Sequence, residues 1–137
     1  MKIVLDSGAT MPTRAHEFDA GLDLYSTEEK TINPYGFETF ETGVHIELPK
    51  WTYGLIQSKS GLNSKHGVVC CGGTIDSGYT GAIKVTLYNF GKEAYTIRDG
   101  DKVAQLVIMP CYLPELELSE SLHETDRGDK GFGSTGR

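Results

Sequence analysis

A carboxylate at the end of a predicted strand is the strongest candidate for base chemistry in this sequence. Asp76 follows Ile75 within the segment Gly72–Gly81. A carboxylate that is partly desolvated at a strand end would be a better base toward a water molecule, and the adjacent Gly72 and Gly73 would let a ligand approach the backbone closely. An ordinary β-turn that carries an aspartate explains the same residues, so the pattern alone leaves both interpretations open.

Anion-binding groups stand where the one predicted helix begins. We expect a short helix around residues 60–66, and Lys59, Ser60 and Gly61 lie at its start. Exposed amides at a helix start favour anions, while the lysine adds a positive charge and the serine adds a hydroxyl donor. For an isolated match, a simple helix cap is the commoner explanation of such a serine.

Two polar residues lie inside apolar runs. Asp23 stands between Leu22 and Leu24 in a predicted strand, where it is either an exposed acid or an acid that faces a cleft and holds a magnesium-bound water. Gln105 interrupts the apolar run 103–109. A structural hydrogen-bond network would satisfy that amide as well as a ligand would.

The C-terminal stretch 126–137 contains four glycines and a single aromatic residue, Phe132. A disordered tail is one interpretation. The other is a mobile arm that orders over a phosphorylated ligand, because glycines let backbone amides approach phosphate oxygens and an aromatic ring can stack on a base. The charged and hydroxyl donors of this arm would be Arg127, Lys130, Ser134 and Thr135.

One further segment, Ile3–Ala9, resembles the catalytic turn of a retroviral-type aspartic protease, in which two carboxylates share a proton. Only five residues precede Asp6, which is too few for the strand that leads into that turn. A first strand that ends in an ordinary turn is the preferred interpretation.

The elements that must position these residues are short strands. Apolar residues alternate with polar ones in 81–88 and 44–48, and turn signals separate the runs. Pro114–Glu124 is acidic, but its leucines could still pack as a strand. No long amphipathic helix or internal repeat is visible, so we expect one all-β domain, a sandwich or barrel of antiparallel strands.

Composition narrows the possible partners. The chain has 137 residues, a net charge of −6 and 38% hydrophobic residues. The negative charge argues against non-specific nucleic-acid binding. No apolar stretch is long enough for a membrane span or a signal peptide. The core is small, and subunit association could supply additional buried apolar surface. Cys70, Cys71 and Cys111 are odd in number and lack zinc-site spacing, which indicates reduced thiols and a cytoplasmic location.

Five segments, in order, resemble the five motifs of the trimeric dUTP pyrophosphatase (dUTPase) family. One motif alone is weak, but five with family-like spacing are highly specific. The resemblance implies a distorted jelly roll over residues 1–125, a closing arm over 126–137, and a homotrimer with shared active sites. It implies magnesium-assisted hydrolysis of dUTP to dUMP and pyrophosphate, which limits uracil in DNA and supplies dUMP for thymidylate synthesis. The segments are Ala20–Tyr25, Lys59–Leu62, Gly73–Ile83, Gly100–Leu106 and Arg127–Gly136.

The resemblance also implies a role for each matching residue. Asp76 would activate the attacking water, Asp23 would contact Mg²⁺ through water, and Tyr79 would pack on the deoxyribose and exclude a ribose 2′-hydroxyl. A hairpin would bind the edge of the uracil through the backbone of Gly73, Thr74 and Ile75 and the backbone near Lys84. It would leave no room for a methyl group at C5 of the base. Phosphate contacts would come from Lys59, Ser60, Gly61 and Gln105, and arm contacts from Arg127, Phe132, Gly133, Ser134 and Thr135.

The sequence departs from the family pattern at Lys59, where the family usually has arginine; lysine keeps the charge but loses the planar bidentate fork. A dCTP deaminase shares the fold and is the nearest enzyme alternative. The segment Ile75–Tyr79 and the arm fit the pyrophosphatase better. A catalytically idle interaction protein is the alternative from another class. The intact motifs argue against lost activity, although a second role in binding a regulatory protein stays open.

Overall fold

The computed structural model describes residues 1–130, and in this part of the chain it contains eleven strands and one short helix. The predicted all-β class is confirmed. The strands are β1 Lys2–Leu5, β2 Gly21–Tyr25, β3 Lys30–Ile32, β4 Phe37–Glu41, β5 Val44–Glu47, β6 Thr52–Gln57, β7 Val68–Cys70, β8 Thr74–Asp76, β9 Lys84–Asn89, β10 Tyr95–Ile97 and β11 Lys102–Pro110; the helix is α1 Ser60–His66.

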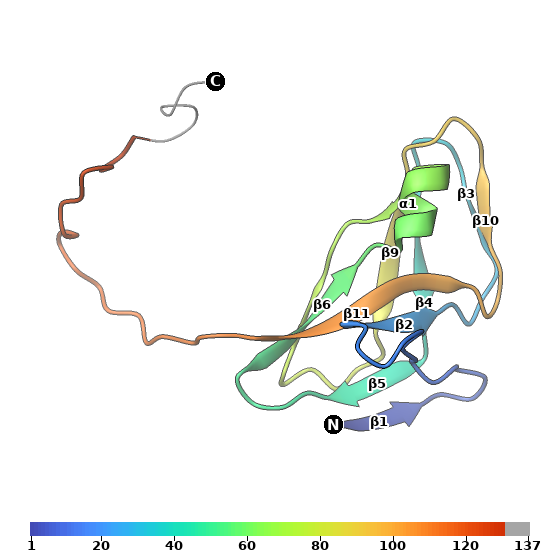
Figure 1. Cartoon of the computed structure of the whole chain (residues 1–137), viewed down its shortest axis with the longest axis horizontal. Coiled ribbons are helices and arrows are strands. Elements are labelled where there is room, and N and C mark those ends of the chain that lie inside the picture. The colour runs from blue at the N-terminus through green and yellow to red at the C-terminus, as the bar shows by residue number, and fades with distance from the viewer. Residues whose placement is uncertain (131–137) are drawn as a thin grey trace.

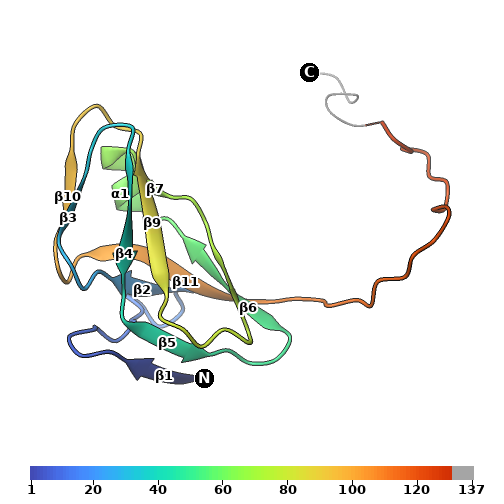
Figure 2. The ribbon, with the colours of Figure 1, turned by 180° about the vertical axis from the view of Figure 1, so that it is seen from behind.

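The strands form a jelly-roll body of two main sheets and two ribbons, and every pairing is antiparallel (Figures 1 and 2). One sheet has the order β2-β11-β6-β8 and the other has the order β4-β9-β7. The ribbons are β1-β5 and β10-β3. The first sheet carries both predicted carboxylates and the predicted amide, because Asp23, Gln105 and Asp76 all belong to its strands.

The core lies between the sheets and follows the predicted alternation. On β9, Val85 and Leu87 are buried, whereas Thr86 and Tyr88 are half-buried on the outer face. Phe40 and Leu106 are fully buried beside them in the same core cluster. Burying such a side chain stabilises the fold by about 1.5–3 kcal/mol, so this alternation fixes which face of β9 points outward.

The helix α1 has the predicted bounds. It ends at Gly67, which has a φ of 66° and whose amide donates to the Asn63 carbonyl. Glycine suits this left-handed C-terminal position. A Cβ there would also lie 3.1 Å from the Gly91 backbone nitrogen. The turn therefore packs α1 closely against the segment that follows β9.

After β11 the chain runs away from the body as an extended segment (Figure 1). The prediction that Pro114–Glu124 packs as a strand is wrong for the isolated chain, because no strand follows β11 within the described residues. The cause is the lack of neighbours: Leu116 and Leu118 are 96% and 101% exposed. Among residues 1–130 no helix is long and apolar enough to cross a membrane. All three cysteines are free thiols, as predicted.

Candidate active site

A buried carboxylate with three polar partners forms the first half of the candidate site. Asp23 on β2 is 1% exposed. Its Oδ1 accepts hydrogen bonds from Lys59 Nζ at 2.5 Å and from Gln105 Nε2 at 3.2 Å, and its Oδ2 contacts Lys102 Nζ at 2.7 Å. The structure thus brings together three residues that lie far apart in sequence, Asp23, Lys59 and Gln105. We call Asp23, Lys59, Lys102 and Gln105 the cation cluster.

The electrostatics of the cation cluster keep the carboxylate charged. Burial raises the pKa of Asp23, but hydrogen bonds from Lys102, Lys59 and Gln105 together outweigh burial, so the pKa lies below its ordinary value. Asp23 is therefore not the exposed acid of one sequence interpretation. The two lysines keep access to solvent, with side chains 22% (Lys59) and 44% (Lys102) exposed.

Two members of this arrangement were not singled out by the sequence reasoning. Lys102 stands in the segment Gly100–Leu106, three residues before Gln105, and only the fold shows that it reaches Asp23. Gly21 is opposite Val107 in the register of β2 and β11. A Cβ at Gly21 would lie 3.0 Å from the Gln105 side chain, so a glycine here lets that amide reach Asp23.

Ser60 and Gly61, the other predicted anion-binding residues at the helix start, follow Lys59 of the cation cluster directly in sequence. Lys59 precedes α1 in an extended conformation and makes no side-chain cap, and Ser60 is the first helical residue. The helix-cap interpretation of Ser60 is therefore wrong. Gly61 has open space where a side chain would be, so the surface above the first turn is accessible to a ligand.

The second half of the site is an open pocket at the loop between β8 and β9. These strands belong to different sheets, so the hairpin that the resemblance implies is not formed between them in the single chain. Thr74, Ile75, Asp76, Tyr79, Ala82 and Lys84 line a cavity of about 280 Å³. Asp76 is exposed in the single chain, so the predicted partial desolvation is not present there. Gly73, also a predicted residue, lies just before β8, and its carbonyl accepts from the Ile56 amide at 3.0 Å. We call this cavity the hairpin pocket, after the hairpin that the resemblance implies for this segment.

Tyr79 is held in place by its own loop. Its amide donates to the Asp76 carbonyl and its hydroxyl donates to the Ala82 carbonyl, both at 2.9 Å. A Cβ on Gly81 would lie 2.5 Å from the Tyr79 hydroxyl oxygen, so the ring lies over Gly81 and a side chain there would displace it. Lys84 forms an exposed ion pair with Glu41 at 2.6 Å, which raises the pKa of Lys84.

One chain does not bring the cation cluster and the hairpin pocket together. Gln105 pairs with Gln57 on β6, whereas Asp76 pairs with Tyr53, four residues along the same strand. That offset is roughly 13 Å along β6, and Asp23 lies three strands from Asp76, about 14 Å across the sheet. A phosphate at Lys59 would therefore be out of hydrogen-bond reach of Asp76 in the same chain.

The predicted arm is only partly described. Arg127 is exposed, and its Nε donates to the Lys130 carbonyl at 3.1 Å within a local turn. Phe132, Gly133, Ser134 and Thr135 lie outside the described residues. The arm residues that the structure does describe do not contact the cation cluster or the hairpin pocket.

The chain is similar to known proteins over nearly its whole length. A deoxyuridine 5′-triphosphate nucleotidohydrolase of Clostridium novyi (strain NT) is 46% identical over 130 residues, which cover 93% of this chain and 92% of that protein. The dUTPase of Staphylococcus bacteriophage 80alpha with dUPNHPP has a TM-score of 0.91 and 32% identity, covering 99% of this chain and 98% of that one.

A second similar structure bears on metal binding. A mutant dUTPase from phage phi11 of S. aureus, described for its coordination of a structural Mg(II) ion, has a TM-score of 0.81 and 32% identity and covers 88% of this chain and 96% of that one. The family model of dUTPases matches residues 7–136. The chain belongs to the dUTPase family.

Proposed function

We propose that this protein hydrolyses dUTP to dUMP and pyrophosphate, and so limits uracil in DNA while supplying dUMP for thymidylate synthesis. The observation that carries the proposal is the pairing of two half-sites in a dUTPase fold. One offers cations beside a buried carboxylate, and the other offers a carboxylate and an aromatic ring in an open pocket. A nucleoside triphosphate needs both kinds of surface.

The hairpin pocket is the proposed nucleoside and water site. Asp76 would hold and deprotonate the water that attacks the α-phosphorus in line, and positioning and charge stabilisation would account for catalysis without a covalent intermediate. The Tyr79 ring, fixed over Gly81, would pack against the deoxyribose and exclude a ribose 2′-hydroxyl. The backbone of Gly73, Thr74 and Ile75, with that near Lys84, would read the uracil edge.

The cation cluster is the proposed triphosphate site. Lys59 stands at the start of α1 beside Ser60 and Gly61, and its partly exposed ammonium could move from Asp23 to a phosphate oxygen. Lys102 would then keep Asp23 paired through Oδ2, and Gln105 would be free to contact phosphate. Because two lysines pair with Asp23, Lys59 can move to a phosphate without leaving the buried carboxylate unpaired.

The residues fit a magnesium ion that arrives on the substrate. Within residues 1–130 no group of three or more His, Cys, Asp or Glu could hold a metal. Mg²⁺ is usually held by one or two carboxylates, substrate phosphates and several waters, and when bound it would neutralise the triphosphate and fix its shape. Asp23 would contact it through water, on the oxygen that Lys59 vacates.

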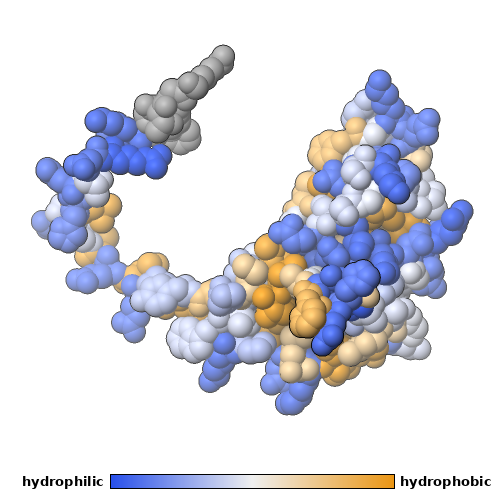
Figure 3. Space-filling model, viewed as in Figure 1, coloured by the Kyte–Doolittle hydropathy of each residue, from blue (hydrophilic) through white to orange (hydrophobic). Residues whose placement is uncertain are grey.

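We propose that the sites are completed in a homotrimer. Four leucines after β11 are largely exposed, and Figure 3 shows apolar patches along the extended segment and on the adjoining body. Association would bury this surface and bring one chain's hairpin pocket to another's cation cluster. The leucines are Leu113, Leu116, Leu118 and Leu122.

Residues 1–125 would then form the enzyme body and residues 126–137 the arm that closes over a site. Arg127, Phe132, Gly133, Ser134 and Thr135 would supply the closing contacts. The three free thiols support a reducing, cytoplasmic location.

A side-by-side assay tests the proposed function. Pyrophosphate release is measured with dUTP, dTTP, dCTP and UTP in the presence of Mg²⁺, and ammonia release is measured with dCTP. We expect rapid pyrophosphate release from dUTP alone. Ammonia from dCTP, or equal turnover of dUTP and UTP, would contradict the proposal.

A further inference from the structure

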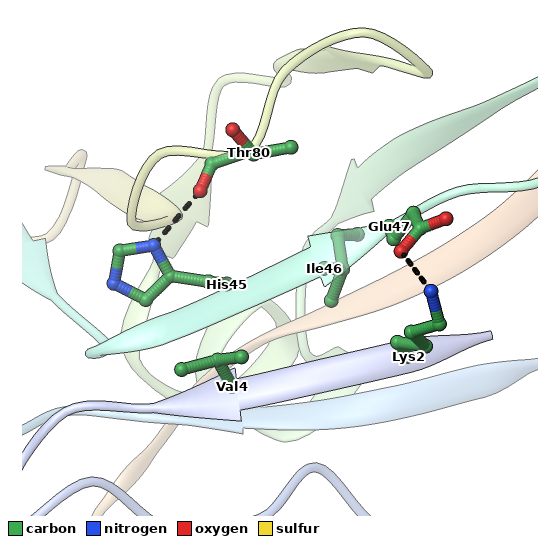
Figure 4. Close-up of a pocket in the computed structure, with 6 residues that line it drawn as sticks. All are labelled: Lys2, Val4, His45, Ile46, Glu47 and Thr80. Carbon is green, nitrogen blue, oxygen red and sulfur yellow. Dashed lines mark hydrogen bonds and ion pairs between the residues drawn. The ribbon is translucent and has the colours of Figure 1, made fainter.

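His45 connects the hairpin pocket to the N-terminal ribbon. It lies on β5, opposite Val4 of β1. Its Nδ1 is 2.9 Å from the Thr80 carbonyl oxygen and its Nε2 is 3.3 Å from Asp6 Oδ1. Figure 4 shows the ring reaching from β5 to the Thr80 carbonyl, with Lys2 and Glu47 farther along the same groove of about 330 Å³.

Both ring nitrogens of His45 therefore face acceptors. A carbonyl oxygen and a carboxylate can only accept hydrogen bonds, so both contacts are made together only by the doubly protonated imidazolium. The Asp6 carboxylate belongs to an anchored residue, since the Asp6 amide donates to the Gly43 carbonyl at 2.9 Å. Neutral His45 can keep one contact but must turn a lone pair toward the other acceptor.

A hydrogen bond to the Thr80 carbonyl acts on the loop that carries the Tyr79 ring. Thr80 separates Tyr79 from Gly81, the residue over which the Tyr79 ring lies. Within the described residues, His45 is the only side chain outside the loop that hydrogen-bonds to its backbone between Ser77 and Ala82. The next outside anchor is the Val44 carbonyl, which accepts from the Ile83 amide at 2.9 Å.

We propose that His45 is a positioning residue which, as an imidazolium, holds the Thr80 carbonyl and thereby keeps the Tyr79 ring in place for sugar selection. The proposal rests on the proposed function of the hairpin pocket. It assigns to His45 no contact with substrate, and its effect passes through the loop. Its consequence is that discrimination between deoxyribose and ribose depends on pH.

The charges around His45 set the direction of that dependence. The hydrogen bond to the Thr80 carbonyl, followed by the contact with Asp6, raises the pKa of His45, and burial opposes them only in part. The other charged groups of the groove, Lys2 and Glu47, pair with each other at 3.1 Å. Because the pKa is raised on folding, the anchoring through both ring nitrogens is complete below the ordinary histidine pKa, and one of its two hydrogen bonds is lost as pH rises through the higher folded value.

The test compares wild type with His45→Gln and Asp6→Asn, using Lys2→Ala as the matched control. Lys2→Ala removes an exposed ion pair in the same groove and leaves Thr80 untouched. The kcat/KM ratio for dUTP over UTP is measured between about pH 6 and pH 8.5. In the absence of substrate, the pH titration of the Tyr79–Gly81 amides and of the His45 ring is followed by NMR.

We expect the wild-type and Lys2→Ala ratios to fall roughly threefold to tenfold across this range, the size expected for losing one hydrogen bond. The His45→Gln ratio should be flat, and Asp6→Asn should move the midpoint to lower pH. Amides of Tyr79–Gly81 that do not follow the His45 titration, or a His45→Gln ratio that falls like wild type, would overturn the proposal. Failure of wild type to hydrolyse dUTP at every pH would instead refute the proposed function, and the NMR titration would still test His45.

Discussion

The cation cluster and the hairpin pocket are built in opposite ways. Asp23 is buried, and both of its oxygens meet ammonium groups of the same chain. Asp76 is exposed and lines an open cavity. A buried charge needs compensating partners within the same fold, whereas an exposed carboxylate is solvated by water and can pair later with substrate or with another subunit. The difference supports the proposal that the phosphate end is preformed and that the other end is completed by assembly.

The largest effect is expected at the hairpin pocket. Asp76→Asn keeps the shape of the side chain but cannot take a proton from water. We expect kcat to fall roughly 10²-fold or more, the range for loss of a general base, while a non-hydrolysable dUTP analogue still binds. Steady-state kinetics and calorimetric binding measure the two quantities. Near-normal kcat would remove Asp76 from its proposed role.

Truncation after Thr125 should have the next largest effect. Residues 126–130 are exposed and make only local contacts, so thermal stability and oligomeric state should stay nearly unchanged. Turnover should fall more than tenfold, because Arg127 and the remaining arm residues would no longer close the site. A truncated protein that hydrolyses dUTP as fast as the full chain would show that the arm is only a tail.

Phe132→Ala should lose tenfold to a hundredfold in kcat/KM, which corresponds to the roughly 1–3 kcal/mol of base stacking.

Asp23→Asn should lower stability, in addition to weakening the proposed water-mediated contact with Mg²⁺. The variant leaves Lys59 and Lys102 without a counter-charge, and because both can reach solvent the cost should be about 1–3 kcal/mol. The pKa of Asp23 is lowered on folding, so its stabilisation is present above the unfolded value of about 3.9 and is lost as pH falls through the folded value. Urea unfolding at neutral and acid pH should therefore show the two proteins converging in acid. A constant gap at every pH would contradict the ion pairing.

Lys59→Arg should have the smallest effect. Arginine keeps the positive charge and adds a bidentate fork, so kcat/KM should change less than about threefold. Lys59→Met is the matched control, since it removes the charge at similar length, and it should lower kcat/KM about tenfold. Equal activity of the arginine and methionine variants would mean that residue 59 does not bind phosphate.

Local patterns predicted much of the fold but little of the pairing between distant residues. The alternation around Val85 and Leu87 and the glycine after α1 are readable because strands and helix ends depend on neighbouring residues. The partnership of Asp23 with Lys102 depends on the register of β2 against β11, which no local pattern encodes. The absence of a strand at Pro114–Glu124 was also not predictable from a local pattern, because its leucines have no neighbour in the isolated chain.

Subunit mixing tests the central claim most directly, namely that one chain's hairpin pocket completes another chain's cation cluster. Asp76→Asn and the double variant Lys59→Met with Ser60→Ala are each purified, then unfolded and refolded together in equal amounts. When the two variants assemble at random, about one quarter of all sites would combine an intact pocket from one chain with an intact cluster from another. We predict recovery of up to that share of wild-type dUTP hydrolysis, well above either parent refolded alone. Mixed trimers no more active than their parents would show that each chain builds its own site, contrary to this account.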